Sequence, residues 1–398
     1  MQKLRLKIIL PVIFLTFLLA WYGLLSISFV QAGGAEGTDF HWFYSVGLIC
    51  RQYGPGHVYD LELAAPVQAQ VAGVPLDEKL LLLPNHPPFV YPRMALLAGL
   101  PFRVAYGINI AYAWIFTALF SIIIFKLLMK LAWPPGAALT FIFGLLFFEP
   151  FIISLLRGQD TYLLLVGGLL FLYGFLDKKD WLAGMGLSLV LIRPQVALLL
   201  ALPFLFRQRK VFWWFLASAG VLGLYSLLLV GWQGAWQYLQ VLGLSTGVAA
   251  HGWDEVLMYN LVGLLIRLFP AMEVSLIHTI GWVVFGLSLL TLCLVWRLSH
   301  SLQVWHIALA ISLSLFASPH LHYHDLALLL VSILGLGLVG IRSGRLGHFL
   351  ASLLPMLVSL LLVLGDHWEV AHYPLTYLLL FSLPVLTWFI GRRVPAYP

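Results

Sequence analysis

The sequence predicts an all-α integral membrane protein that crosses the membrane many times. Of its 398 residues, 62% are hydrophobic and 10% are charged, whereas soluble domains are about half apolar and about a quarter charged. Apolar runs long enough to span a bilayer recur along the chain, and basic residues gather at alternate ends of these runs. A soluble enzyme is therefore excluded. The net charge of +6 is too small to indicate a nucleic-acid partner.

The first apolar run, residues 8–30, is expected to be a membrane helix. Lys3, Arg5 and Lys7 precede it, and positive residues mark the cytoplasmic side. A cleaved signal peptide is the alternative, but its apolar region is normally only about 7–15 residues long. The amino terminus is then cytoplasmic, and residues 31–88 form a first extracytoplasmic loop with interfacial helices.

Nine further full spans are expected, which gives ten in all. Their predicted ranges are 104–129, 136–156, 162–176, 211–230, 274–296, 304–317, 326–341, 346–364 and 373–390. Residues 181–192 and 195–206 are too short to cross singly, at about 18 Å each as helix, and basic clusters flank the pair on both ends. We expect a half-crossing hairpin that enters from the cytoplasm and turns at Arg193-Pro194.

The charge distribution supports this topology. It places 15 of the 22 basic residues in the cytoplasm with only two acids, Asp177 and Asp180. The carboxyl terminus is then also cytoplasmic, and the remaining acids and most histidines lie in the membrane or outside it. The chemistry is expected on the extracytoplasmic side of one membrane domain, residues 1–398. Cys50 and Cys293 are far apart and form neither a redox nor a metal-binding motif.

Asp39 is the candidate general base. It follows the first span, where a carboxylate at the membrane surface could accept a proton from a hydroxyl held at the same level. The alternative is that Thr38 or Asp39 caps a helix on the interface, with Trp42, Phe43 and Tyr44 as an aromatic belt.

Two further polar segments follow. The proline-rich stretch from Asn85 to Arg93 predicts only a bend in the chain. Arg157-Gly158-Gln159-Asp160 is either an ordinary turn or a set of donors, Arg157 and Gln159, for an anion or for sugar hydroxyls.

Arg193 and a histidine cluster are candidates for binding an anion. A guanidinium at membrane depth needs a counter-charge or a water cavity, and its partner could be a lipid phosphate or an intramembrane acid such as Glu149. His320, His322 and His324 could bind a metal. Hydrogen bonding to a phosphate needs fewer partners and is favoured.

Together these segments carry a family resemblance. Their order along the chain is Asp39 with Tyr44, Phe89-Val90-Tyr91-Pro92, Gly158-Gln159, Arg193-Pro194, Asn260-Leu261-Val262-Gly263, and Ser318-Pro319 with His322-Tyr323. This order resembles glycosyltransferase family 87, mannosyltransferase-like members of the GT-C superfamily. Arg93 stands where the family commonly has a second proline, and Arg193 stands where it usually has lysine.

The resemblance implies the GT-C fold and an inverting transfer of a hexosyl, by family a mannosyl, residue. The donor would be a polyprenyl monophosphate sugar, and the acceptor a lipid or glycan hydroxyl in glycolipid biosynthesis of the cell envelope. Asp39 would be the base. Arg193, His322, His320, His324 and Arg157 would bind the donor phosphate, and Tyr44, Tyr91, Gln159 and Asn260 would bind substrate. A monophosphate donor requires no metal, and no cofactor is expected.

Two other functions stay open. A transporter would also have broken helices, but it usually has inverted repeats, and none is visible. A lipid-binding or flippase-like protein would use the Arg193 hairpin and would need no base at Asp39.

Overall fold

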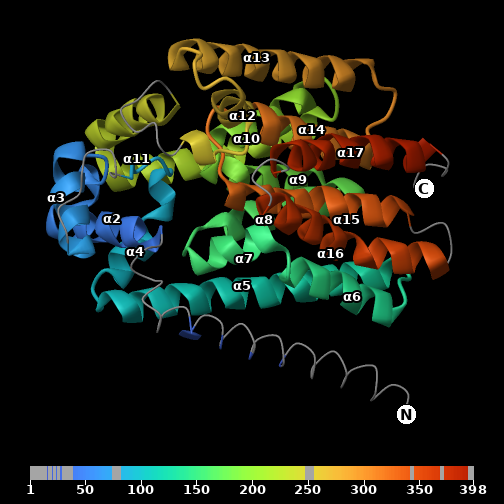
Figure 1. Ribbon diagram of the computed structural model, residues 1–398, viewed down its shortest axis with the longest axis horizontal. Coiled ribbons are helices and arrows are strands. Elements are labelled where there is room, and N and C mark those ends of the chain that lie inside the picture. The colour runs from blue at the N-terminus through green and yellow to red at the C-terminus, as the bar shows by residue number, and fades with distance from the viewer. Residues whose placement is uncertain are drawn as a thin grey trace.

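The computed structural model describes residues 39–73, 82–246, 255–340, 345–367 and 372–392, together with five isolated positions before residue 39. Throughout these ranges every regular element is a helix (Figure 1). The predicted first span, residues 8–30, lies outside the described residues apart from those isolated positions.

Three helices are long and apolar enough to cross a membrane. They are α5 (Phe102–Lys130), α11 (Arg209–Thr246) and α13 (Val274–Leu298). A fourth such unit is the pair α6 (Pro135–Leu146) and α7 (Glu149–Leu156), which is bent by 49°. The chain therefore has the composition of a membrane protein. In the other helices the apolar stretches have 10–17 residues, so the expected ten crossings remain a prediction.

The bend between α6 and α7 divides the predicted span 136–156. Pro150 lies in the first turn of α7, where its missing N–H is tolerated. The neighbouring N–H of Glu149 donates instead to Ser359 Oγ at 3.0 Å. This bond ties the bend to α16 (Arg345–His367).

The predicted hairpin is present as two short helical arms. The first arm is α9 (Asp180–Leu189) with η5 (Val190–Ile192), and the second is α10 (Pro194–Ala201) with η6 (Leu202–Leu205). Arg193 leaves helical geometry, with φ −124° and ψ 82°, and Pro194 begins the second arm. Glycines allow close packing of α9: a Cβ on Gly186 would lie 2.4 Å from the backbone nitrogen of Phe171 in α8 (Thr161–Leu176).

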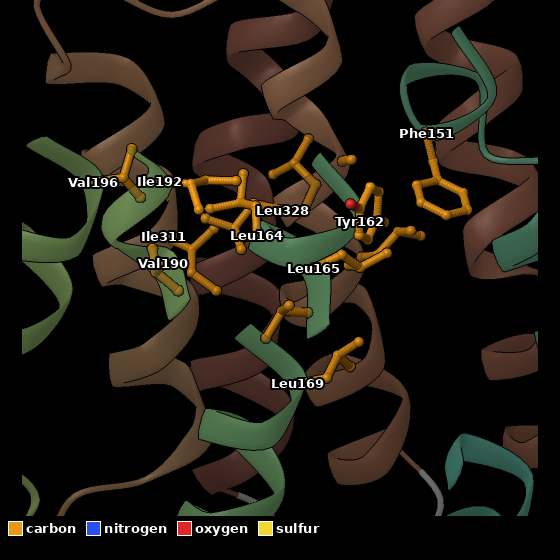
Figure 2. Packing of buried hydrophobic residues seen from close by; sticks show 14 of the residues in the cluster. Phe151, Tyr162, Leu164, Leu165, Leu169, Val190, Ile192, Val196, Ile311 and Leu328 are labelled. Carbon is orange, nitrogen blue, oxygen red and sulfur yellow. The ribbon is translucent and has the colours of Figure 1, made fainter. Parts of the chain in front are cut away.

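The hairpin lies inside the helical bundle. The start of α9 meets the start of α11, where a Cβ on Gly184 would lie 2.6 Å from the carbonyl oxygen of Val211. Figure 2 shows the apolar packing around the tip, with Val190 and Ile192 beside Leu164 of α8 and Ile311 of α14 (Val304–Ala317). The remaining carboxyl-terminal helices, η8 (Tyr323–Leu328), α15 (Leu329–Gly340), α16 and α17 (His372–Arg392), complete the bundle.

A helical cap forms one end of the molecule. It contains α2 (Phe40–Gln52), η2 (Pro55–His57), α3 (Leu61–Ala72), η4 (Pro88–Val90) and α4 (Pro92–Leu97) (Figure 1). Asp60 caps α3 by accepting a bond from the Glu62 N–H at 3.0 Å. Trp42 and Phe43 of α2 are buried. The alternative that places them in an aromatic belt at the membrane interface is therefore wrong, because they pack inside the cap.

Helix α11 is broken at Gly231, whose φ of 68° is a backbone conformation that favours glycine. The predicted span 211–230 ends at this break. The helix continues beyond it to Thr246, and the sequence pattern did not predict this continuation. The continuation packs on the cap, where the rings of Tyr238 and Tyr59 lie 5.1 Å apart.

Candidate functional site

Arg193 lies at the centre of a buried polar cluster at the tip of the hairpin. Its Nε donates to Asp325 Oδ1 at 2.8 Å. Its two terminal nitrogens lie 2.7 Å from His86 Nε2 and 3.1 Å from His324 Nε2. The guanidinium is only 8% exposed. Two segments distant in sequence from the hairpin therefore converge on one cation.

Asp325, and not Glu149, is the acid paired with Arg193. The carboxylate of Glu149 accepts a hydrogen bond from the Tyr323 hydroxyl. The expected alternative of an acid partner for Arg193 is therefore confirmed, but the acid is Asp325 and the example Glu149 is wrong. Asp325 reaches the guanidinium because the chain turns into η8 at His322, whose N–H bonds to the same carboxylate at 3.4 Å.

The surroundings of His86 in this cluster favour its neutral form. Burial, and then the positive charge of Arg193, hold its pKa well below the ordinary range. A neutral imidazole can accept the hydrogen bond of the guanidinium through Nε2. The backbone of His86 is fixed by the Tyr59 hydroxyl, which donates to its carbonyl oxygen at 2.7 Å. His86 thus joins the cap to the hairpin.

The three predicted histidines lie side by side next to Arg193. The ring of His322 is 4.7 Å from that of His320 and 5.7 Å from that of His324. His320 and His322 are half-buried, whereas His324 is buried. The segment is held by Gln195, whose amide donates to the His320 carbonyl at 2.9 Å. Across the part of the chain that is described, no group of three or more metal-ligating side chains is arranged to hold a metal ion.

Asp39 is held against the turn between α7 and α8. Gln159 Nε2 donates to Asp39 Oδ2 at 2.7 Å, and the Phe40 N–H donates to the Arg157 carbonyl at 2.9 Å. Gly158 makes this contact possible: its φ is +74°, and a Cβ there would lie 2.6 Å from that of Phe40. The structure thus brings together Asp39, Arg157 and Gln159 of the predicted set.

The turn that holds Asp39 lies next to the Arg193 cluster. His324 lies within electrostatic range of both Arg193 and Arg157. The ring of Trp42, one turn after Asp39, is 5.0 Å from the ring of His86. A carboxylate and a group of cations and imidazoles therefore form neighbouring parts of one polar region.

Three other predicted substrate-binding residues hold the chain itself. Asn260 caps α12 (Leu261–Leu268) and donates to the Ser318 carbonyl at 2.7 Å. The Tyr44 hydroxyl donates to the Leu100 carbonyl at 2.7 Å. Tyr91 is buried, with its ring 5.8 Å from that of Tyr59. Asn260 and Tyr44 therefore hold parts of the chain in place, and contact of these three residues with substrate stays a prediction.

A second buried ion pair, Arg93 with Asp160, was not anticipated. Arg93 Nη2 lies 3.6 Å from Asp160 Oδ1. The guanidinium also donates to the Tyr162 hydroxyl and lies over the Tyr112 ring at 5.1 Å. Burial raises the pKa of Asp160, and the charges of Arg93 and Arg193 oppose this shift.

His86, Asp325, Arg93 and Asp160 are thus the residues that the predicted set lacks. All four stand inside the polar segments singled out in the sequence. The available signal was their position next to predicted site residues. Nothing in the sequence indicated which acid would meet which arginine.

The fold and this polar region define a helical membrane protein with a buried cationic centre beside a carboxylate. The family model of glycosyltransferase family 87 matches residues 85–319, which is more than half of the chain. The protein therefore belongs to glycosyltransferase family 87 and is a membrane glycosyltransferase. Searches of curated proteins and of solved structures gave no match.

The matched residues cover only part of the site. Arg193, Arg157, Gln159, Tyr91 and Asn260 fall within them. Asp39, Tyr44 and the three predicted histidines lie outside this range. The link between Asp39 and the matched part of the chain is therefore the hydrogen bond from Gln159.

Proposed function

We propose that this protein transfers a hexosyl, by family a mannosyl, residue from a polyprenyl monophosphate to a hydroxyl of a lipid or glycan, with inversion at the anomeric carbon. The observation that carries the proposal is the Gln159–Asp39 bond of 2.7 Å. It holds a half-exposed carboxylate beside a region rich in positive charge and imidazole groups. A general base and an anion site are the two functions that such a transfer requires.

In the proposed reaction Asp39 takes the proton of the acceptor hydroxyl. The acceptor oxygen forms a bond to the anomeric carbon, and the bond from that carbon to the phosphate oxygen breaks. Its electron pair leaves with the phosphate, which gains negative charge. Groups that bind this charge stabilise the transition state more than the ground state.

The donor phosphate is proposed to meet the accessible members of the cluster. Arg157 is exposed and His320 and His322 are half-buried, so these three can contact a ligand. Asp325, His86 and His324 already bond to three donors of the Arg193 guanidinium, and both Arg193 and His324 are buried. Their contribution is then a fixed positive field and a fixed position for the histidine segment.

The proposed topology keeps ten spans, cytoplasmic termini and an extracytoplasmic site within one domain, residues 1–398. The basic ends of α5 and α8 support it. Lys130 Nζ lies 3.0 Å and Lys179 Nζ 2.7 Å from the carboxylate of Asp177, so both ends meet at one face. Positive residues mark the cytoplasmic side.

The test is transfer by purified protein in lipid nanodiscs with EDTA. The donor is synthetic polyprenyl-phosphate-mannose, and the acceptors are supplied as a membrane lipid extract. We expect sugar transfer by the wild type and a loss of about 100- to 10,000-fold in Asp39→Asn, the range for removal of a general base. Mass spectrometry of the products measures both.

Glu62→Gln is the matched control, since Glu62 is an exposed acid of the same cap and should keep wild-type activity. Equal activity of Asp39→Asn and wild type would reject Asp39 as the base. Donor binding without any transfer or hydrolysis by the wild type would favour the lipid-binding or flippase alternative.

A further inference from the structure

A cleft separates the start of α3 from the continuation of α11 beyond Gly231. Its volume is about 510 Å³. The described residues that line it are Tyr59, Leu61, Gln237, Gln240, Val241, Gly243 and Leu244. None of these side chains is charged. The described lining of the cleft is thus uncharged, unlike the cluster around Arg193.

Packing contacts hold the two segments that line the cleft in place. The break at Gly231 turns α11 onto the cap, and a Cβ on Gly234 would lie 3.0 Å from the carbonyl oxygen of Gly56. The rings of Tyr59 and Tyr238 pack at 5.1 Å. The cleft is therefore a consequence of how these two segments dock.

The lining suits a ligand that carries hydroxyl groups. The side-chain oxygen of Gln237 is buried and has no hydrogen-bond partner in the described part of the chain. An amide can both donate and accept, as a hydroxyl can. A charged headgroup would lose hydration without gaining a counter-charge from the lining. An uncharged headgroup therefore fits this cleft best.

The cleft also lies between two exposed tryptophans and the polar cluster. Trp232 and Trp236, on the same part of α11, are 79% and 57% exposed, and exposed tryptophans are typical of the membrane–water interface. On the other side, the Tyr59 hydroxyl donates to the carbonyl of His86, and His86 contacts Arg193. A lipid headgroup held here would adjoin the site while its chains stayed in the bilayer.

We propose that this cleft binds the uncharged, hydroxyl-rich headgroup of a membrane glycolipid, which acts as the acceptor. The role as acceptor rests on the proposed function. Binding of the headgroup does not, and it can be measured in protein that lacks Asp39.

The first experiment measures binding to Asp39→Asn protein in nanodiscs by saturation-transfer NMR. The probes are hexyl mannopyranoside and hexyl glucopyranoside, with hexyl phosphate as an anionic competitor. We expect the glycosides to bind and hexyl phosphate not to displace them. Added Gln237→Leu should weaken glycoside binding at least tenfold, because the amide is lost.

Gly243→Trp provides a steric block. A Cβ on Gly243 meets nothing within 4 Å, so the side chain can enter the cleft without displacing the backbone. Gly223→Trp is the matched control, since Gly223 has equal room on the first part of α11. Binding should be lost in the first variant and kept in the second. Unchanged binding in Gly243→Trp, or displacement by hexyl phosphate, would overturn the proposal.

Catalytic assays separate this inference from the proposed function. In otherwise wild-type protein, Gly243→Trp should lose transfer to glycolipid while still hydrolysing the donor with water. Transfer with an unchanged acceptor KM would refute the acceptor site alone. Absence of both transfer and hydrolysis in the wild type would refute the proposed function. The NMR measurements with the hexyl glycosides would still show whether the cleft binds an uncharged headgroup.

Discussion

Arg193 and Arg93 are both paired with a buried aspartate, but their environments differ. Arg193 has Asp325, His86 and His324 all within 3.1 Å. Arg93 lies 3.6 Å from Asp160 and is otherwise held by tyrosines. Arg193 is thus a cation held by three short hydrogen bonds, whereas Arg93 belongs to a looser pair whose acid has a pKa raised by burial. The first is expected to be costly to remove and the second much less so.

The largest effect is expected from Arg193→Met. The substitution leaves Asp325 buried without its cation, and breaking such a pair costs about 3–5 kcal/mol. The thermal unfolding midpoint in detergent should fall sharply, and transfer should be lost. Arg193→Lys keeps the charge, but a lysine cannot reproduce the planar set of donors, so it should be intermediate. Stability of Arg193→Met equal to wild type would show that the three contacts contribute little.

A smaller effect is expected at Asp160. Because burial raises its folded-state pKa, its favourable contribution is present below the unfolded pKa and is lost as pH rises through the folded value. Asp160→Asn, which cannot ionise, should therefore match or exceed wild-type stability at neutral pH, by less than about 2 kcal/mol. Thermal unfolding between pH 4 and 8 should show the gap closing as pH falls.

Arg93→Met provides a second test of the same pH dependence of thermal unfolding. Arg93 lowers the pKa of Asp160, so its removal should move the pH dependence to higher pH. A shift to lower pH, or none, would mean that the pair is not coupled as its 3.6 Å separation indicates.

The smallest effect is expected at Asp177, an acid paired at the surface. Hydrogen bonds from Lys179 and then Lys130 lower its pKa to about 2. Any stabilisation is present above the unfolded pKa and is lost as pH falls towards 2. Exposed pairs are screened by water and salt, so Asp177→Asn should unfold at nearly the wild-type temperature. A drop comparable to that of Arg193→Met would contradict the ranking by burial.

The features that the sequence predicted best are those whose pattern lies within one continuous segment. The hairpin followed from two short apolar runs, their basic flanks and Arg193-Pro194. Its two arms, including η5 and η6, begin and end within two residues of the expected limits. The span 304–317 coincides with α14. The continuation of α11 past Gly231 was missed, because a glycine after an apolar run also signals a helix end.

The site was predictable in residue type but not in pairing. Arg193 was expected to need an acid, yet Asp325 is 132 residues further along the chain. His86 was assigned only to a bend, since a proline-rich turn gives no sign of what it will face. Asn260 was expected to meet substrate, and nothing in the sequence indicated that its amide also bonds to Gly263 and Ser318. Such choices depend on tertiary contacts that have no local signature.

The separation between Arg193 and Asp325 also has a consequence for biosynthesis. A ribosome adds Arg193 132 residues before it adds the counter-ion Asp325, a delay of roughly 10 s at ordinary elongation rates. For that interval the guanidinium must be sheltered by lipid headgroups, water or the insertion machinery. A chain truncated before η8 would keep Asp39 and Gln159 but would leave this arginine without its acid. Quality control during insertion should therefore be most sensitive to the last third of the sequence.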